Sequence, residues 1–197
     1  RGFGIDGVEF SADDPLPAEP RLPGRHNREN AAAATAAARA AGVPDTAIAQ
    51  ALRTFPGVPH RLELVRELRG VRWVNDSKAT NTAAARRGIA AYEAPLRLIL
   101  GGSPKGEDFT SFARELPGNV RSVYLIGAAA DALAAALDAA GRLYVQAGDL
   151  AAAVAQAAAE AEPGDVVLLS PACASYDQFA SFEERGDAFR RLVTELP

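Results

Sequence analysis

Several large classes of protein depend on residues or patterns that this sequence lacks. Cysteine occurs once, at Cys173, and methionine does not occur at all. One cysteine excludes a disulfide framework and a cysteine-rich metal site, and it favours a reducing, cytoplasmic setting. The apolar stretches fall short of the roughly eighteen residues that suggest a membrane helix, and the N-terminus has no secretion-signal pattern. We therefore expect neither a membrane partner nor a resident metal.

The charge balance excludes another group of partners. Acidic residues outnumber basic ones by 25 to 21, which gives a net charge of −4 and no electrostatic footprint for nucleic acid. Any bound anion must therefore be held by a few well-placed cations. With 197 residues, 48% of them hydrophobic, the chain suits a soluble globular protein of one or two domains. It opens on Arg1 rather than methionine, so we expect a piece of a longer protein.

The N-terminal part of the sequence predicts two helices. Alanine-rich residues 27–41 predict the first helix, and residues 44–54 predict the second. The segment Pro-Gly-Val-Pro at residues 56–59 is typical of a linker. We therefore expect one domain to end within residues 1–57 and another to occupy residues 58–197.

From residue 62 onward, short apolar runs alternate with stretches of helical pattern. Such alternation is typical of an α/β fold in which a mostly parallel sheet is covered by helices on both faces. Six strands are predicted, at residues 62–65, 71–74, 96–100, 120–126, 142–145 and 166–169. Helices are predicted between and after them, at residues 82–92, 109–116, 129–140, 150–161 and 178–195.

Three of the segments that follow these strands are rich in hydroxyls, glycines and lysines. They are residues 75–81 (Asn-Asp-Ser-Lys-Ala-Thr-Asn), residues 101–106 (Gly-Gly-Ser-Pro-Lys-Gly) and residues 170–175 (Ser-Pro-Ala-Cys-Ala-Ser). In open α/β sheets, ligands bind outside the carboxyl ends of the strands. The fold can therefore bring the three loops together at one binding site.

Two lysines give these loops their chemical character. Asp, Ser, Thr and Asn cap helices well, which explains much of residues 75–81 as an ordinary strand-to-helix turn. Lys78 does not fit that interpretation, because a cation near a helix N-terminus opposes the macrodipole. Lys105 in the second loop, with the hydroxyls nearby, suits the binding of a carboxylate better than acid–base catalysis. A tight turn explains Gly101 and Gly102 equally well.

Other polar residues have a simple structural interpretation beside a functional one. Cys173 is expected to be a small buried thiol, and Asp177 is expected to begin the last helix. Asn27 and Asn30 lie three residues apart on one helical face, where they either cap the helix or meet a ligand. Arg61 suits a bidentate phosphate contact, although surface arginines are common.

Five motifs together resemble the Mur ligases of peptidoglycan synthesis. They are residues 24–31 (Gly-Arg-His-Asn-Arg-Glu-Asn-Ala), residues 57–61 (Gly-Val-Pro-His-Arg), residues 75–81, Gly101-Gly102 with Lys105, and residues 170–175 followed by Asp177-Gln178-Phe179. The resemblance covers nearly the whole chain from Leu22 and is most specific to the branch that adds glutamate. It implies a monomeric cytoplasmic ligase of three domains. Residues 1–57 would be a small helical remnant of the central ATP-binding domain, and residues 58–197 the Rossmann-like glutamate-binding domain.

In that family, ATP converts a substrate carboxylate to an acyl phosphate, which the amine of the incoming amino acid attacks. The resemblance implies ATP and Mg²⁺ as cofactors, and D-glutamate and UDP-N-acetylmuramoyl-L-alanine as substrates. It assigns Lys78 to catalysis, Asn27, Asn30, Arg61 and Asp76 to ATP, and Thr80, Lys105, Ser175 and Phe182 to D-glutamate. The chain lacks the family's phosphate-binding loop, carbamylated lysine and magnesium ligands. We therefore expect it to hold no cofactor and to be inactive alone.

Two other functions fit the same residues. A ligase that adds L-glutamate to folate is similar in outline, but in place of residues 75–81 it usually carries an Asp-x-Ala-His-Asn pattern, which is missing here. A non-catalytic Rossmann-like module that binds a nucleotide or small anion is the other alternative, although no Gly-x-Gly-x-x-Gly fingerprint opens a helix. Saturable binding of NAD by the isolated chain would favour the module over a ligase.

Overall fold

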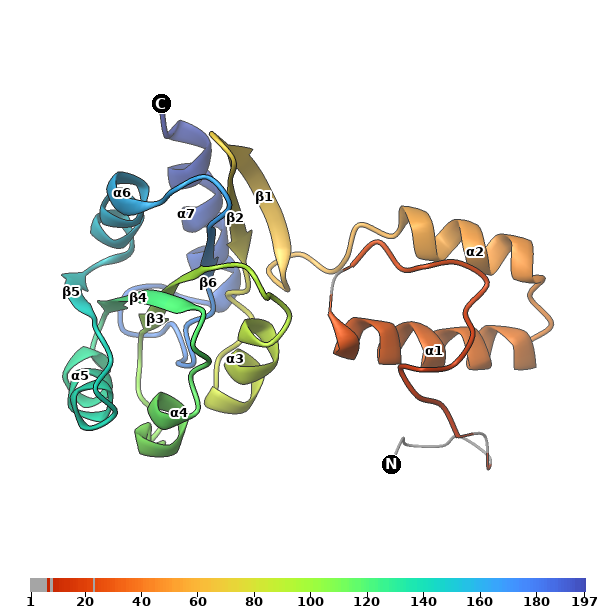
Figure 1. Ribbon diagram of the computed structural model, residues 1–197, viewed down its shortest axis with the longest axis horizontal. Helices are drawn as coiled ribbons and strands as arrows, with labels where there is room; N and C mark the ends of the chain where they lie inside the picture. Colours follow the sequence, from red (N-terminus) through yellow and green to blue (C-terminus); the bar gives the residue numbers. More distant parts are fainter. Residues whose placement is uncertain (1–6, 8, 23) are drawn as a thin grey trace. The chain divides into compact units, whose positions relative to one another are not determined.

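The computed structural model describes residues 7, 9–22 and 24–197, which form two compact units. Unit 1 extends from Arg1 to Gly57, and unit 2 extends from Val58 to Pro197 (Figure 1). Within the described residues, no helix is long and apolar enough to cross a lipid bilayer.

Unit 1 consists of two helices and the loop that precedes them. Helix α1 (Arg25–Ala40) and helix α2 (Asp45–Thr54) form near the two predicted positions. They bury small or branched apolar side chains, namely Ala31, Ala32, Ile48 and Ala49. Arg28 of α1 donates to the carbonyl oxygen of Ala12 at 2.6 Å, and Arg25 pairs with Asp13 at 2.7 Å. Two arginines in the first turn of α1 thus hold the preceding loop.

Unit 2 is an α/β domain built on one sheet. Its strands are β1 (Glu63–Leu68), β2 (Val71–Asn75), β3 (Leu96–Gly101), β4 (Val120–Ile126), β5 (Val145–Gly148) and β6 (Val166–Leu169). Its helices are α3 (Thr82–Ile89), α4 (Thr110–Arg114), α5 (Ala130–Ala139), α6 (Leu150–Glu160) and α7 (Phe182–Glu195). The strand order is β1-β2-β6-β3-β4-β5, in which β1 pairs with β2 antiparallel and the other neighbours pair in parallel. The predicted six-stranded, mostly parallel sheet is confirmed.

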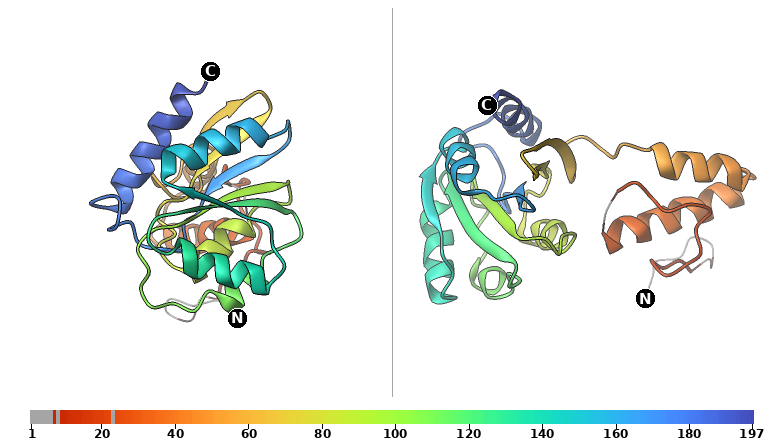
Figure 2. Two further views of the ribbon diagram at one scale, coloured as in Figure 1. Left: turned by 90° about the vertical axis from the view of Figure 1, so that its left-hand side faces the viewer. Right: turned by 45° about the horizontal axis from the view of Figure 1, so that its top comes forward.

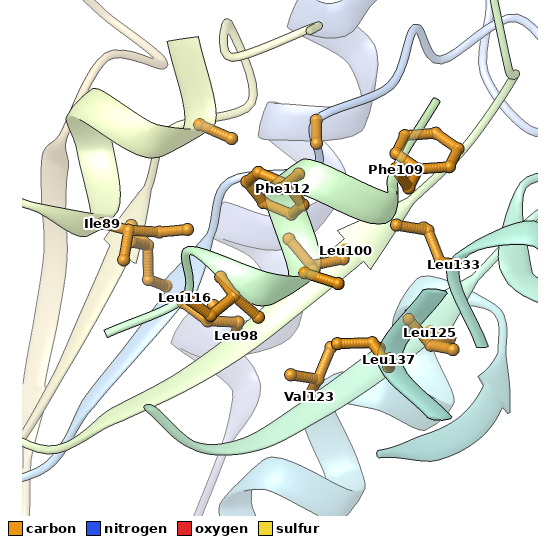
Figure 3. Packing of buried hydrophobic residues seen from close by; sticks show 14 of the residues in the cluster. Ile89, Leu98, Leu100, Phe109, Phe112, Leu116, Val123, Leu125, Leu133 and Leu137 are labelled. Atoms are coloured by element: carbon orange, nitrogen blue, oxygen red, sulfur yellow. The ribbon is translucent and has the colours of Figure 1, made fainter. Parts of the chain in front are cut away.

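Alternation along the strands sends apolar side chains to both faces of the sheet. On one face, Leu98 and Leu100 of β3 pack with residues of α3, α4 and α5, including Ile89 and Phe112 (Figure 3). On the other face, Ile99 belongs to a second cluster, formed with residues of α6 and α7. The ribbon views show these two helices on the face of the sheet opposite α3, α4 and α5 (Figure 2). The predicted cover of helices on both faces is therefore confirmed. The central strands are almost wholly apolar because neither face meets water.

The last strand in the sequence occupies the middle of the sheet and determines where the three candidate loops lie. β6 pairs in parallel with both β2 and β3, so the segments that follow these strands leave the same end of the sheet side by side. Backbone hydrogen bonds join these segments. The amide of Asp76 donates to Leu169 at 2.8 Å, and the amide of Gly101 donates to Pro171 at 2.8 Å. The topology thus brings the loops together.

β5 begins later than predicted. It starts at Val145, because the chain first has to complete the C-terminal turn of α5. There Gly141 adopts a φ of 64°, and the amide of Arg142 donates to the carbonyl oxygen of Leu137 at 2.9 Å. This pattern of a left-handed glycine and a returning hydrogen bond is a common helix ending.

Helix α7 also begins later than predicted, and the expectation for Asp177 is wrong. The N-cap is Ser181, whose hydroxyl oxygen accepts from the amide of Glu184 at 3.2 Å. The Ser-x-x-Glu spacing is a capping signal that the sequence carries. Asp177 instead accepts from the amide of Ala128 at 2.8 Å, just before α5. Asp177 therefore makes a long-range hydrogen bond and does not cap α7.

Arginines of β1 and α7 fasten these two elements together. Arg66 donates to carbonyl oxygens at the end of α7, those of Val193, Thr194 and Leu196, at 3.0 to 3.2 Å. The last carbonyl oxygens of a helix lack amide partners in a following turn, so these bonds from Arg66 cap the C-terminal end of α7. Arg190 in the middle of α7 pairs with Glu63 at 2.8 Å. The helix is thereby fixed along its length relative to the sheet.

Close packing at Gly186 gives a test of this arrangement. A Cβ at Gly186 would lie 2.2 Å from His60 Nδ1 and 3.0 Å from Asn75 Nδ2. We predict that Gly186→Ala destabilises the protein, because overpacking costs about 1–3 kcal/mol and outweighs a gain in helix propensity of about 1 kcal/mol. Urea unfolding followed by circular dichroism measures the change.

The control for this prediction is Gly118→Ala, because a Cβ at Gly118 would meet nothing within 4 Å. Its stability should match that of the wild type. An equal or greater stability for Gly186→Ala contradicts the packing of α7 described above.

Candidate functional site

The first candidate loop begins with a buried carboxylate. Asp76 is 5% exposed; its Oδ1 accepts from the amide of Leu62 at 3.2 Å, and its Oδ2 accepts from Ser170 Oγ at 2.9 Å. Burial raises the pKa of Asp76 to about 7, while the bonds from Ser170 and Leu62 and the charge of Arg61 act in the opposite direction. Asp76 therefore links the segment before β1 to the ends of β2 and β6.

Lys78 follows Asp76 by two residues and contacts Phe182. Lys78 is exposed, and its Nζ lies 4.9 Å from the centre of the Phe182 ring, within the range of a cation–π contact. Phe182 is the first residue of α7, and its carbonyl oxygen accepts from Ser77 Oγ at 2.8 Å. The ring of His60 packs edge-on against the Phe182 ring, with 6.1 Å between their centres. The predicted catalytic lysine thus lies near the N-terminus of α7.

The second loop turns sharply at Gly101 and Gly102. Their φ angles are 123° and 132°, and a Cβ on Gly102 would lie 2.2 Å from the carbonyl oxygen of Ala174. The turn interpretation of the glycines is confirmed, and the same geometry lets the second loop approach the third. The amide of Ser103 donates to Ala174 at 2.9 Å. Lys105, two residues further along, is exposed.

The third loop is buried. Ser175 and Cys173 are each 2% exposed. Burial raises the pKa of the Cys173 thiol to about 12, so the thiol is protonated at neutral pH and is a poor nucleophile. The charges of Arg185 and Lys105 lower that pKa, while those of Glu107 and Asp177 raise it. The loop then turns toward α7, where the carbonyl oxygen of Ser175 accepts from the amide of Phe179 at 2.8 Å.

Arg185 of α7 joins all three loops, and the reasoning from sequence missed it. It is 1% exposed, and burial lowers the pKa of its guanidinium to about 10, so that it stays charged at neutral pH. It donates to Ser77 Oγ at 2.9 Å, Ser77 O at 2.9 Å, Gly101 O at 3.5 Å, Ala174 O at 3.0 Å and Cys173 O at 3.1 Å. The sequence carries one signal: Arg185 shares the buried face of α7 with Phe189 and Val193, where an arginine is out of pattern.

The remaining predicted site residues differ in solvent exposure. Arg61 is exposed just before β1, and Thr80 is half-buried just before α3. In unit 1, Asn27 is 8% exposed and Asn30 is exposed, although both belong to α1. Within unit 2, hydrogen bonds connect the loops of Lys78, Thr80, Lys105 and Ser175 with one another and with Phe182.

The chemistry of this arrangement suits a small anion. Lys78 and Lys105 are the only lysines in a sequence with 21 basic residues, and both are exposed on joined loops. Lysine supplies a compact charge with three donors, and the first amides of a helix add further donors for an anion. In the part of the chain that the structure describes, no group of three or more His, Cys, Asp and Glu side chains could hold a metal ion.

Comparison with known proteins identifies the class to which this fold and site belong. Residues 60–173 match the family described as Mur ligase, glutamate ligase domain, and the chain belongs to this family. Its fold is similar to that of the MurF ligase from Thermotoga maritima, whose structure was determined in complex with ADP. The TM-score is 0.58 and the identity 19%, over 89% of this chain and 40% of that one.

Sequence relatives narrow the class further. The chain is 51% identical to the UDP-N-acetylmuramoylalanine--D-glutamate ligase of Sphingopyxis alaskensis over 90% of its length. It is 53% identical to the ligase of the same name from Anaeromyxobacter dehalogenans over 88% of its length. It covers 41% and 38% of these relatives, so it spans about two fifths of their length. The family resemblance found in the sequence is confirmed.

The buried carboxylate of Asp76 predicts a pH dependence of stability. An unfolded aspartate titrates at about pH 3.9. The raised pKa therefore means that the folded state binds more protons than the unfolded state up to about pH 7. The contribution of Asp76 to stability is therefore complete below the unfolded value and is lost as the pH rises through the folded value. Asparagine can replace both of its hydrogen bonds without a charge, since it accepts from Leu62 and donates to Ser170.

We predict that Asp76→Asn becomes more stable relative to the wild type as the pH rises from about 4 to about 7, by up to about 1.4 kcal/mol per pH unit. Urea unfolding of both proteins across this range measures the difference. A difference that stays constant with pH would show that Asp76 does not carry the buried charge described here.

Proposed function

We propose that the chain is the glutamate-binding part of an ATP-dependent ligase that adds D-glutamate to UDP-N-acetylmuramoyl-L-alanine in peptidoglycan biosynthesis. The observation that carries this proposal is the position of the only two lysines, exposed on joined loops after β2 and β3. Identity of 51% and 53% to ligases of that name supports the substrate, including its D configuration. The proposed ligase is cytoplasmic and monomeric.

Glutamate is placed by groups from all three loops. Lys105 pairs with a carboxylate, and the hydroxyls of Thr80 and Ser175 orient it. The backbone of Phe182 contributes at the start of α7, where the first amides have no partner within the helix and favour an anion.

Lys78 acts at the reacting carboxylate. In the proposed reaction the UDP-sugar peptide receives a phosphoryl group from ATP on its carboxylate, and the free amine of D-glutamate attacks the acyl carbon with loss of phosphate. A cation beside this centre stabilises the negative charge that develops on oxygen. The exposed ammonium of Lys78, 4.9 Å from the Phe182 ring centre, lies near a residue assigned to glutamate, which supports a role where the two substrates meet.

The family resemblance assigns four residues to the nucleotide. Asn27 and Asn30 of α1 contact the adenine, and the exposed Arg61 contacts phosphate or ribose. Asp76 is buried and holds the amide of Leu62 at 3.2 Å, so its part in nucleotide binding is exerted through the neighbouring Arg61. The described residues offer no carboxylate cluster for Mg²⁺, so we assign its ligands to other parts of the ligase.

A separate glutamate-binding unit makes chemical sense for this reaction. Acyl phosphates hydrolyse, so a domain that brings in the amine and excludes water protects the intermediate. Residues 56–59 (Pro-Gly-Val-Pro), where unit 1 gives way to unit 2, are the proposed hinge.

Substitution of the two lysines in the full-length ligase tests the assigned roles. We predict that Lys105→Ala raises the KM for D-glutamate about tenfold or more, because a charge-assisted hydrogen bond is lost. Lys78→Ala should lower kcat about a hundredfold, because it removes charge stabilisation at the reacting centre. Steady-state release of ADP at varied glutamate concentration measures both.

Arg87→Ala is the matched control, since it removes an exposed cation from the neighbouring helix α3. Its kinetics should equal those of the wild type. Wild-type kinetics for both lysine variants would refute the assignment of the site.

The presence of only two lysines permits a direct binding test on this chain. Reductive methylation with ¹³C-formaldehyde labels Lys78, Lys105 and the N-terminal amine, and Lys→Arg variants assign the signals. We predict that D-glutamate shifts the Lys105 signal saturably and more strongly than L-glutamate does, because a nearby carboxylate changes the field at the ammonium. NAD should shift neither lysine; saturable shifts with NAD alone would support a nucleotide-binding module instead.

A further inference from the structure

We infer that Arg185 is the positioning residue of the glutamate site. Its guanidinium fixes the three glutamate-binding loops relative to one another, and it places an unpaired positive charge beneath them. This inference rests on the proposed function, because it concerns how glutamate is oriented. Nothing in the motifs of the sequence assigns a role to this residue.

The hydrogen bonds of Arg185 use its full capacity. A guanidinium has five N–H donors in a fixed plane, and Arg185 makes five hydrogen bonds to oxygens of Ser77, Gly101, Cys173 and Ala174. These oxygens come from three loops that are far apart in the sequence, so the rigid fork fixes the loops relative to one another. A lysine at this position has three donors at one point and cannot span the same acceptors.

Two of the acceptor residues, Ser77 and Ala174, lie next to a residue that we assign to glutamate or to the reacting centre. Ser77 precedes Lys78, and Ser77 Oγ, which accepts from Arg185 Nε at 2.9 Å, donates in turn to the carbonyl oxygen of Phe182 at 2.8 Å. Ala174 precedes Ser175 and accepts from Nη1 at 3.0 Å. Arg185 thus sets the backbone positions of Lys78, Ser175 and Phe182 at the same time.

The charge of Arg185 is not neutralised by these contacts, because all five acceptors are uncharged oxygens. Asp177 is the acid whose charge acts on Arg185, but its Oδ2 accepts from the amide of Ala128 at 2.8 Å. A buried cation normally has a carboxylate partner, since its desolvation is costly. A bound dicarboxylate at the loops above would supply the missing negative charge.

Kinetics of the full-length ligase test this inference. Arg185→Lys keeps the charge but loses the fork, and we expect it to raise the KM for D-glutamate about tenfold while the KM for ATP changes less than about twofold. Ser77→Ala removes the Nε acceptor and the link to Phe182, and it should raise the KM for D-glutamate about threefold. Thermal unfolding of each variant shows whether it is folded at the assay temperature.

Arg190→Lys is the matched control, because it makes the same change on the same helix, where Arg190 pairs with Glu63 and Asp187 rather than with the loops. It should leave both KM values unchanged. If Arg185→Lys is folded and has a wild-type KM for D-glutamate, the inference is overturned. If Arg185→Lys does not fold, a wild-type KM for D-glutamate in Ser77→Ala overturns it. An equal rise of both KM values in Arg185→Lys also overturns it, because it marks a general loss of structure. If the wild-type full-length protein shows no glutamate-dependent release of ADP, the proposed function is refuted, and this inference is refuted as well.

Discussion

The geometry of the candidate site depends on one buried cation. The guanidinium of Arg185 is 1% exposed and can avoid a large desolvation cost only if its N–H groups all find acceptors. Ser77, Gly101, Cys173 and Ala174 supply those acceptors from three different loops. The constraint acts in both directions, because the loops satisfy the guanidinium and the guanidinium holds the loops together.

The rest of unit 2 places that guanidinium. β6 lies between β2 and β3, which makes the three loops neighbours before any side chain acts. Arg66 and Arg190 bind helix α7 to β1. These bonds fix the position of Arg185 relative to the sheet and its loops. Asp76 adds a link from the end of β2 to Leu62 and Ser170. Together these contacts fix the backbone of the loops that carry the two exposed lysines.

Much of this could be predicted from the sequence, because it depends on local patterns. The alternation of apolar runs with helical stretches indicated the α/β sheet, and Lys78 stood out as a charge that capping could not explain. The prediction that Asp177 begins α7 was wrong, because Asp177 contacts Ala128 through a bond that no local pattern contains, and Ser181 caps the helix. Arg185 was missed because its partners are mostly backbone carbonyls, such as that of Gly101, 84 positions away in the sequence. The roles of individual residues toward glutamate and ATP stay predictions.

A crystal structure of this chain with D-glutamate tests whether the three loops form one glutamate site above Arg185. We expect electron density for the amino acid between Lys105, Thr80 and Ser175, with one carboxylate near the start of α7 and the guanidinium of Arg185 unmoved below it. Density for D-glutamate at any other place, or loops that separate from Arg185 when it binds, would show that the loops do not form this site.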